Sequence, residues 1–226
     1  MTLEPIAYFK SPFTSKFGIP RQSGLVPDLR GEIRFTDSYR RVEAVRGLEG
    51  FDFIWLIWGF SANRQDDGDG WQPTVRPPRL GGNTRLGVFA TRSPFRPNPL
   101  GLSSVRIERI DLECEDAPVI HVLGADLMDG TPIVDIKPYI PYTDAHPEAI
   151  GGFTDSVFKN RLHVNAPTEI LNKLEFEKRD ALVAVLEQDP RPAYQDDPER
   201  IYGFSFAGRE IKFKVNNDTL ELLSID

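Results

Sequence analysis

The segment Trp71–Arg106 concentrates arginine in a chain that is acidic overall. It holds six arginines, six prolines and no acidic residue, whereas the whole chain has a formal net charge of -7. Arginine without acidic neighbours is suited to binding phosphate, carboxylate or a base edge outside the chain. Because proline fixes φ and removes backbone donors, these side chains are expected on stiffened loops. We call this stretch the arginine segment and predict that it binds an anion; the alternative is a solvated loop whose arginines pair with distant acids.

Residues for several other kinds of chemistry are scarce. The chain has one cysteine, Cys114, and three histidines without metal-like spacing, so neither an internal disulfide nor a metal centre is expected. It lacks a glycine-rich dinucleotide fingerprint after a strand and a P-loop, which argues against most dehydrogenases, NTPases and the commonest methyltransferase fold. A hydrolase or transferase acting on a small phosphorylated metabolite is disfavoured, because no nucleophile–base pair can be assembled.

Short runs of β-branched and aromatic residues dominate the first two thirds of the chain, with turns rich in glycine, proline and aspartate between them. Without alternating helices, such runs predict a small antiparallel β-barrel. A short helix is expected at Arg40–Phe51, and Trp55 and Trp58 are expected in the core. The predicted strands are Ile6–Phe9, Glu32–Thr36, Phe53–Phe60, Arg85–Thr91, Leu102–Leu112 and Val119–Gly124.

The pattern changes to α+β from about residue 165. Apolar residues at helical spacing predict a helix with a break over Thr168–Glu187, with Thr168 as its N-cap. Alternating residues over Tyr202–Ile225 predict two or three strands. We therefore expect a mainly β protein with a non-Rossmann barrel domain at residues 1–147 and a smaller α+β domain at 148–226. The second part carries 15 acidic and 10 basic residues, which makes it a poor free-standing RNA binder.

The chain is expected in the cytoplasm and not in a membrane. Its first residues lack the basic-then-apolar pattern of a signal peptide. Its longest apolar run, Phe53–Phe60, is far too short to span a bilayer.

Five separated blocks of unusual sequence occur along the chain, among them KFGIPRQSGLV and EQDPRPAY. In composition and order they resemble the TsaA/TrmO-like family, which are S-adenosylmethionine-dependent tRNA methyltransferases. This resemblance implies methylation of the exocyclic amine of threonylcarbamoyl-adenosine, beside the anticodon of a threonine tRNA, by a homodimer with an N-terminal β-barrel. The blocks are Lys16–Val26, Ala44–Phe60, Gly70–Leu102, Asp126–Tyr142 and Glu187–Tyr194.

The resemblance also implies a binding site for S-adenosylmethionine. Arg92 would pair with the methionine carboxylate, Asp126 would accept from ribose hydroxyls or the amino group, and Leu102 would line the adenine. Ser61 and Ala62 stand where other members carry bulkier polar residues, so only their backbone is expected to contribute. The implied cofactor residues are Gln22, Ser23, Gly24, Ser61, Ala62, Arg92, Leu102, Leu123, Gly124, Ala125 and Asp126.

Asp135 and Tyr139 are the candidate catalytic residues. Methylation of an amine releases a proton, so we expect Asp135 to accept it or to orient the acceptor, while Lys137 and Tyr139 hold the modified base. The alternative is that Asp135 and Lys137 form a structural ion pair. The candidate tRNA contacts are Lys16, Arg76, Arg79, Arg85, Arg96, Asn98, Lys137, Arg191 and Tyr194. Arg191 and Tyr194 could instead dock the two domains, and the competing function is a non-catalytic RNA-binding barrel.

Overall fold

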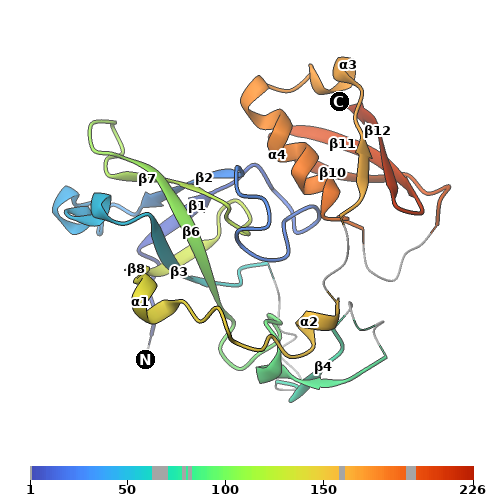
Figure 1. Cartoon of the computed structure of the whole chain (residues 1–226). Coiled ribbons are helices and arrows are strands. Elements are labelled where there is room, and N and C mark those ends of the chain that lie inside the picture. The colour runs from blue at the N-terminus through green and yellow to red at the C-terminus, as the bar shows by residue number, and fades with distance from the viewer. Residues whose placement is uncertain (1, 63–70, 78–79, 81–82, 158–160, 192–196) are drawn as a thin grey trace.

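Six strands close into an antiparallel barrel, in the order β1-β2-β7-β6-β3-β8 (Figure 1). The computed structural model describes residues 2–62, 71–77, 80, 83–157, 161–191 and 197–226. The barrel confirms the fold predicted from the spacing of the strand-like runs. Its strands are β1 (Ala7–Lys10), β2 (Arg30–Phe35), β3 (Phe53–Gly59), β6 (Leu100–Asp111), β7 (Val119–Leu123) and β8 (Pro132–Pro138).

Strand β3 shows how alternation divides the barrel into an interior and an exterior. Its residues Ile54, Leu56 and Trp58 are buried in the barrel core, and the residues between them face outward. Trp58 therefore lies in the core as predicted. Trp55 does not lie in the core, because it is three positions from Trp58, and side chains an odd number of residues apart point to opposite faces of a regular strand. Its indole N–H instead donates to Asp144, at 2.8 Å.

Three local predictions differ from the structure. The expected strand Arg85–Thr91 is only the two-residue β5 (Leu86–Gly87), which pairs with β4 (Thr74–Val75) and leads into a 3-10 turn. The expected helix at Arg40–Phe51 is two short 3-10 turns, Val42–Val45 and Leu48–Gly50. They are separated at Gly47, whose φ of +89° no helix permits. Strand β8 was not predicted, because prolines at both of its ends read as a kinked segment.

The C-terminal part forms a four-stranded sheet in the order β10-β11-β12-β9. The three strands that follow residue 200 confirm the alternating pattern seen in the sequence, and the predicted break divides the helix into two. Pro167, not Thr168, is the N-cap residue of the first piece. The elements are β9 (His163–Asn165), α3 (Thr168–Leu171), α4 (Phe176–Glu187), β10 (Tyr202–Phe206), β11 (Arg209–Asn216) and β12 (Thr219–Ile225), after the short α1 (Pro141–Asp144) and α2 (Thr154–Val157). No helix in the described ranges is long and apolar enough to cross a membrane.

The connection between β1 and β2 leaves the barrel and packs into the core of the C-terminal sheet. Phe13, Val26 and Leu29 are buried among the apolar side chains of α4 and of strands β10 to β12. The Phe13 ring meets that of Phe206 edge-on, with their centroids 5.3 Å apart. In Figure 1 this connection, drawn in blue, runs between the barrel and the C-terminal sheet. The two parts therefore share a core across the predicted division at residues 147 and 148, which stays a prediction.

Gly18 lies where this connection crosses strand β10. Its φ is +89°, and a Cβ atom there would lie 2.4 Å from Cδ2 of Phe204. Gly47 has the same φ but nothing within 4 Å of the corresponding position. A side chain at either glycine would strain the backbone, but only a side chain at Gly18 would also collide with the C-terminal sheet. Substitutions at the two positions can therefore distinguish the two effects.

We expect Gly18→Ala to destabilise the protein more than Gly47→Ala. Both substitutions place an alanine in the left-handed region, at a cost of about 1–2 kcal/mol, and only the first also displaces Phe204. Urea unfolding of both variants would measure the difference, which we expect to be about 1–3 kcal/mol, as for overpacking of a core. Equal loss in both variants would contradict the packing of this connection against β10.

Candidate cofactor and substrate site

A chain of hydrogen bonds runs from the barrel interior to Asp126. The indole N–H of Trp58 donates to Oγ of Ser103 at 3.0 Å, and that hydroxyl donates to Oδ1 of Asp126 at 2.6 Å. The indole can lie across strand β6 because residue 101 is glycine, where a Cβ would come within 2.3 Å of the ring. One carboxylate oxygen of Asp126 is thus fixed by a buried hydroxyl. Sequence reasoning missed Ser103, although it is an inward-facing polar position on a predicted strand.

Burial raises the pKa of the Asp126 carboxyl above its usual range. The hydrogen bond from Ser103, the backbone N–H of Ser23 and the positive charge of Arg92 act in the opposite direction, and burial outweighs them. An ionised carboxylate at this position is therefore poorly solvated. A ligand that brings hydrogen-bond donors or positive charge would relieve that cost.

The predicted cofactor residues near the N-terminus lie beside Asp126. The Arg92 guanidinium donates to the amide oxygen of Gln22. The backbone N–H of Gly24 donates to the carbonyl of Gly124 at 2.8 Å, which ties the β1–β2 connection to the segment after β7. A Cβ at Gly124 would lie 3.5 Å from the Gly24 backbone, so the two chains approach closely. The structure thus brings together residues that are 70 to 100 positions apart in the sequence.

The other predicted cofactor residues have different surroundings. Ala125 is buried in the barrel core, and the Leu123 side chain is also buried. Ser61 and Ala62 are exposed just beyond β3. The Leu102 side chain is 53% exposed and faces the exterior of the barrel, on the opposite side of β6 from Ser103.

Leu102 and the candidate catalytic residue Asp135 share the exterior face of the barrel. Both pair with Ile57 of the central strand β3, from β6 and β8 respectively. Directly opposed residues on neighbouring strands point to the same face, and strands lie about 4.8 Å apart, so the two side chains stand about 10 Å apart. An irregularity in the β3–β8 register beside Ile57 turns Asp135 outward although Ile133 faces the core.

Asp135 also forms the ion pair that the sequence left open as an alternative. Its carboxylate lies 3.0 Å from Nζ of Lys137, and both side chains are about half exposed. An exposed pair of this kind contributes little to stability. Tyr139 packs against the rings of Phe53 and Trp55, with centroids 6.2 and 5.6 Å away. The catalytic roles of Asp135 and Tyr139 stay predictions, as does base binding by Lys137.

The arginine segment presents both cations and aromatic rings to solvent. Arg85 donates to the hydroxyl of Thr74 at 3.3 Å, and Arg96 donates to the carbonyl of Thr91 at 3.1 Å, which braces the loop. The exposed rings of Trp71 and Phe89 lie 5.7 Å apart. Of the other predicted tRNA contacts, Lys16, Arg76 and Asn98 are exposed and Arg191 is buried, while Arg79 and Tyr194 lie outside the described residues.

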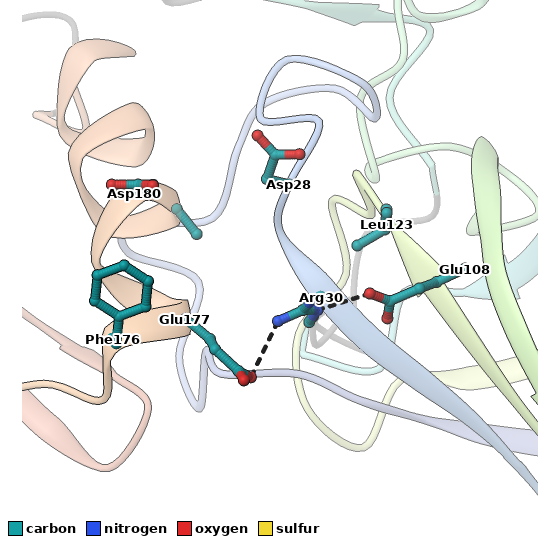
Figure 2. Close-up of a pocket in the computed structure, with 8 residues that line it drawn as sticks. Asp28, Arg30, Glu108, Leu123, Phe176, Glu177 and Asp180 are labelled. Atoms are coloured by element: carbon teal, nitrogen blue, oxygen red, sulfur yellow. Dashed lines mark hydrogen bonds and ion pairs between the residues drawn. The ribbon is translucent and has the colours of Figure 1, made fainter.

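A pocket lies at the junction of the barrel and α4, and the predicted cofactor residue Leu123 is among the residues that line it. Figure 2 shows Arg30 at its centre, between Glu108 of β6 at 2.8 Å and Glu177 of α4 at 3.1 Å. Asp28 and Asp180 add further negative charge to its lining. An acidic pocket of this kind does not suit an RNA phosphate. Among the described residues, no three side chains of His, Cys, Asp or Glu are placed so that they could hold a metal ion together.

Comparison with known proteins gives matches along the whole chain. The family model described as "tRNA-methyltransferase O N-terminal domain" matches residues 8–145, and "TrmO C-terminal domain" matches residues 159–226. A tRNA (adenine(37)-N6)-methyltransferase of Escherichia coli K12 is 40% identical over 232 aligned positions, covering 99% of this chain and 97% of that protein. A Pseudomonas aeruginosa protein named "Putative S-adenosylmethionine-dependent methyltransferase RcsF" is 41% identical, over 89% of this chain and 87% of its own. The crystal structure of TrmO from Pseudomonas aeruginosa has a TM-score of 0.78 at 31% identity, covering 100% of this chain and 98% of that one.

The pH dependence of stability should report the buried state of Asp126. Because its pKa is raised in the folded protein, the contribution of Asp126 to the unfolding free energy falls as the pH rises from about 3.9 through the raised pKa. Asparagine cannot ionise, so Asp126→Asn avoids this loss and should gain stability relative to the wild type over that range. Thermal unfolding of the unliganded proteins across a pH series would measure it.

Ser103→Ala provides a control of opposite sign. It removes the hydroxyl that stabilises the ionised Asp126, so the pKa of Asp126 should rise further and the loss of stability should extend to higher pH than in the wild type. It also leaves the Trp58 indole without its acceptor, which costs about 1–3 kcal/mol. A difference between Asp126→Asn and wild type that does not change with pH would contradict the burial of this carboxyl.

Proposed function

Because this chain belongs to the TrmO family of tRNA methyltransferases through both its N- and C-terminal domains, we propose that it methylates N6 of adenine 37 in tRNA. The observation that carries the proposal is the cluster of Gln22, Arg92 and Asp126 at the edge of the barrel. It combines a guanidinium and a largely buried carboxylate with close-packed glycines, next to a surface rich in arginine and exposed aromatic rings.

The residues of this cluster fit S-adenosylmethionine, which we propose as the methyl donor. Arg92 would pair with its carboxylate, and Asp126, whose second oxygen is free of the Ser103 hydroxyl, would accept from its ribose hydroxyls or amino group. Gly24 and Gly124 leave the backbone open to close approach. S-adenosylmethionine supplies a methyl group on a positively charged sulfur, which becomes a neutral thioether when the methyl leaves.

The chain must then hold the adenine nitrogen in line and take up its proton. Positioning of two reactants in this way typically lowers the activation free energy by several kcal/mol. The nitrogen forms its new bond to carbon and gives up one proton, which Asp135 would accept on the exterior face that it shares with Leu102. Tyr139, which packs against Trp55, and Lys137 would hold the modified base.

The proposed substrate is the threonylcarbamoyl-adenosine of a threonine tRNA. An anticodon loop offers phosphates and unstacked bases, which proteins bind with basic side chains and exposed aromatic rings. The arginine segment supplies the exposed cations Arg76 and Arg85 and the exposed rings of Trp71 and Phe89, and Phe95 is 55% exposed in the same segment. The threonyl carboxylate is a further anion for one of these arginines.

We further propose that the enzyme is a homodimer that works in the cytoplasm, where tRNA is found. The exterior of β3 supports a dimer, because it presents Phe53, Trp55 and Ile57 where a solvated strand would carry polar residues. Phe53 is 40% exposed in the single chain. A second copy would cover Phe53 and would border the face that Asp135 and Leu102 share.

The purified chain should methylate a threonine tRNA that carries threonylcarbamoyl-adenosine. Mass spectrometry of the digested tRNA, after incubation with S-adenosylmethionine, should show the modified nucleoside one methyl group heavier. The matched control is the same tRNA lacking the threonylcarbamoyl group, which should gain no methyl if that group is recognised. If neither tRNA is methylated although S-adenosylmethionine stabilises the protein, the assigned substrate is wrong.

Asp135→Asn should separate catalysis from the structural ion pair. If Asp135 accepts the proton, the variant loses about 10²–10⁴-fold in turnover with unchanged affinity for S-adenosylmethionine. Lys137→Met removes the same ion pair and leaves the carboxylate. Because Lys137 is also proposed to hold the base, the two variants are compared by turnover at saturating tRNA, where weaker tRNA binding does not contribute. Methylation by Asp135→Asn at the wild-type rate would leave Asp135 with the structural role alone.

A further inference from the structure

Arg21 connects the C-terminal domain to the residues proposed to bind the cofactor. Its guanidinium Nη2 donates to the backbone carbonyls of Asp189 and Arg191, at 3.2 and 3.3 Å. These carbonyls belong to the turn that follows α4. Arg21 itself lies in the β1–β2 connection, immediately before the predicted cofactor residues Gln22, Ser23 and Gly24.

The turn that receives Arg21 is held firmly. The Arg191 side chain is 9% exposed and forms a two-point pair with the Asp189 carboxylate, Nε to Oδ1 at 2.8 Å and Nη2 to Oδ2 at 3.0 Å. Asp189 has a positive φ of 52°, and its N–H donates to the carbonyl of Leu186 at the end of α4. This ion pair, between a buried arginine and a partly exposed aspartate, thus holds two carbonyls toward the β1–β2 connection.

On its other side, Arg21 is bonded to the cofactor cluster. The Gln22 side-chain amide donates to the carbonyl of Arg21 at 2.6 Å, and its oxygen accepts from Arg92. Two residues later, the Gly24 N–H donates to the Gly124 carbonyl. The apolar anchors of the connection, buried Pro20 and Val26, lie outside residues 21–25, so they do not by themselves orient Gln22.

We infer that Arg21 is a positioning residue, through which the Asp189–Arg191 turn of the C-terminal domain orients Gln22 and Arg92 for the cofactor. The inference rests on the proposed cofactor and assigns the C-terminal domain a part in building that site. It also gives Arg191 a role inside the protein, in holding the turn, in place of a direct contact with tRNA. Arg21 does not touch the reacting atoms.

Amide hydrogen exchange of the unliganded protein provides the first test. In Arg21→Gln, the Gly24 amide should exchange about tenfold faster than in the wild type, while the amides of β1 and β2 keep their rates. Arg30→Gln is the matched control, because Arg30 also reaches the C-terminal domain, through Glu177, but has no bond to Gln22. It should leave the Gly24 rate within twofold of the wild type.

Calorimetric binding of S-adenosylmethionine, without tRNA, provides the second test. Arg21→Gln should raise its dissociation constant about tenfold and Arg30→Gln less than twofold. Asp189→Asn, which releases the Arg191 pair, should weaken binding similarly, and the double variant with Arg21→Gln should be no weaker than the worse single one. Arg21→Lys, which keeps a donor, should recover part of the affinity.

The outcomes are distinguishable. Unchanged Gly24 exchange and unchanged affinity in Arg21→Gln would overturn the inference, and so would equal effects in Arg21→Gln and Arg30→Gln, which would indicate general loosening of the domain junction. Additive losses in the double variant would show that the turn and Arg21 act separately, and would also overturn it. A wild-type protein that binds no S-adenosylmethionine would remove the proposed cofactor, while the Gly24 exchange rates would still decide whether Arg21 positions this segment.

Discussion

The structure depends on the burial of Phe13, Val26 and Leu29 in the core of the C-terminal sheet. Each such side chain contributes about 1.5–3 kcal/mol when fully buried. Separation of the two parts would expose this apolar surface to water and would therefore cost several kcal/mol of free energy. The connection that carries them also carries Gln22 to Gly24. Packing of the C-terminal sheet and geometry of the cofactor cluster are therefore set by the same stretch of chain. The C-terminal sheet therefore helps to hold the segment of the barrel domain that carries Gln22 to Gly24.

The sequence predicted the elements whose signal is local. Alternation identified five of the six barrel strands, and the three strands after residue 200, because the core and solvent faces of a strand impose a period of two on side-chain type. Strand β8 was missed because its terminal prolines indicate a turn, although the ends of a strand tolerate them. The prediction of a helix at Arg40–Phe51 was wrong, because Gly47 has a left-handed backbone that interrupts a pattern only weakly favourable to a helix.

The site was predictable only in part, because its geometry comes from contacts between distant residues. Resemblance to a family supplied Gln22, Arg92 and Asp126. It did not supply Ser103, whose role appears only when Trp58, 45 positions away, lies across Gly101. Nor did it supply Arg21, whose acceptors are 168 and 170 positions further on. No periodicity within the sequence encodes such pairs, so they emerge only when the fold is known.

The arginine segment gains a more definite meaning from the hydrogen bonds of its members. Elsewhere in the barrel, Arg30 and Arg34 pair with carboxylates, which neutralise them. Arg85 and Arg92 instead donate to neutral oxygens, of a threonine hydroxyl and a glutamine amide. Those bonds orient the guanidinium groups without cancelling their charge, and among the described residues neither forms an ion pair. An acidic protein can thereby hold a positive surface that is oriented in advance, and negative charge on a bound carboxylate or RNA phosphate completes it.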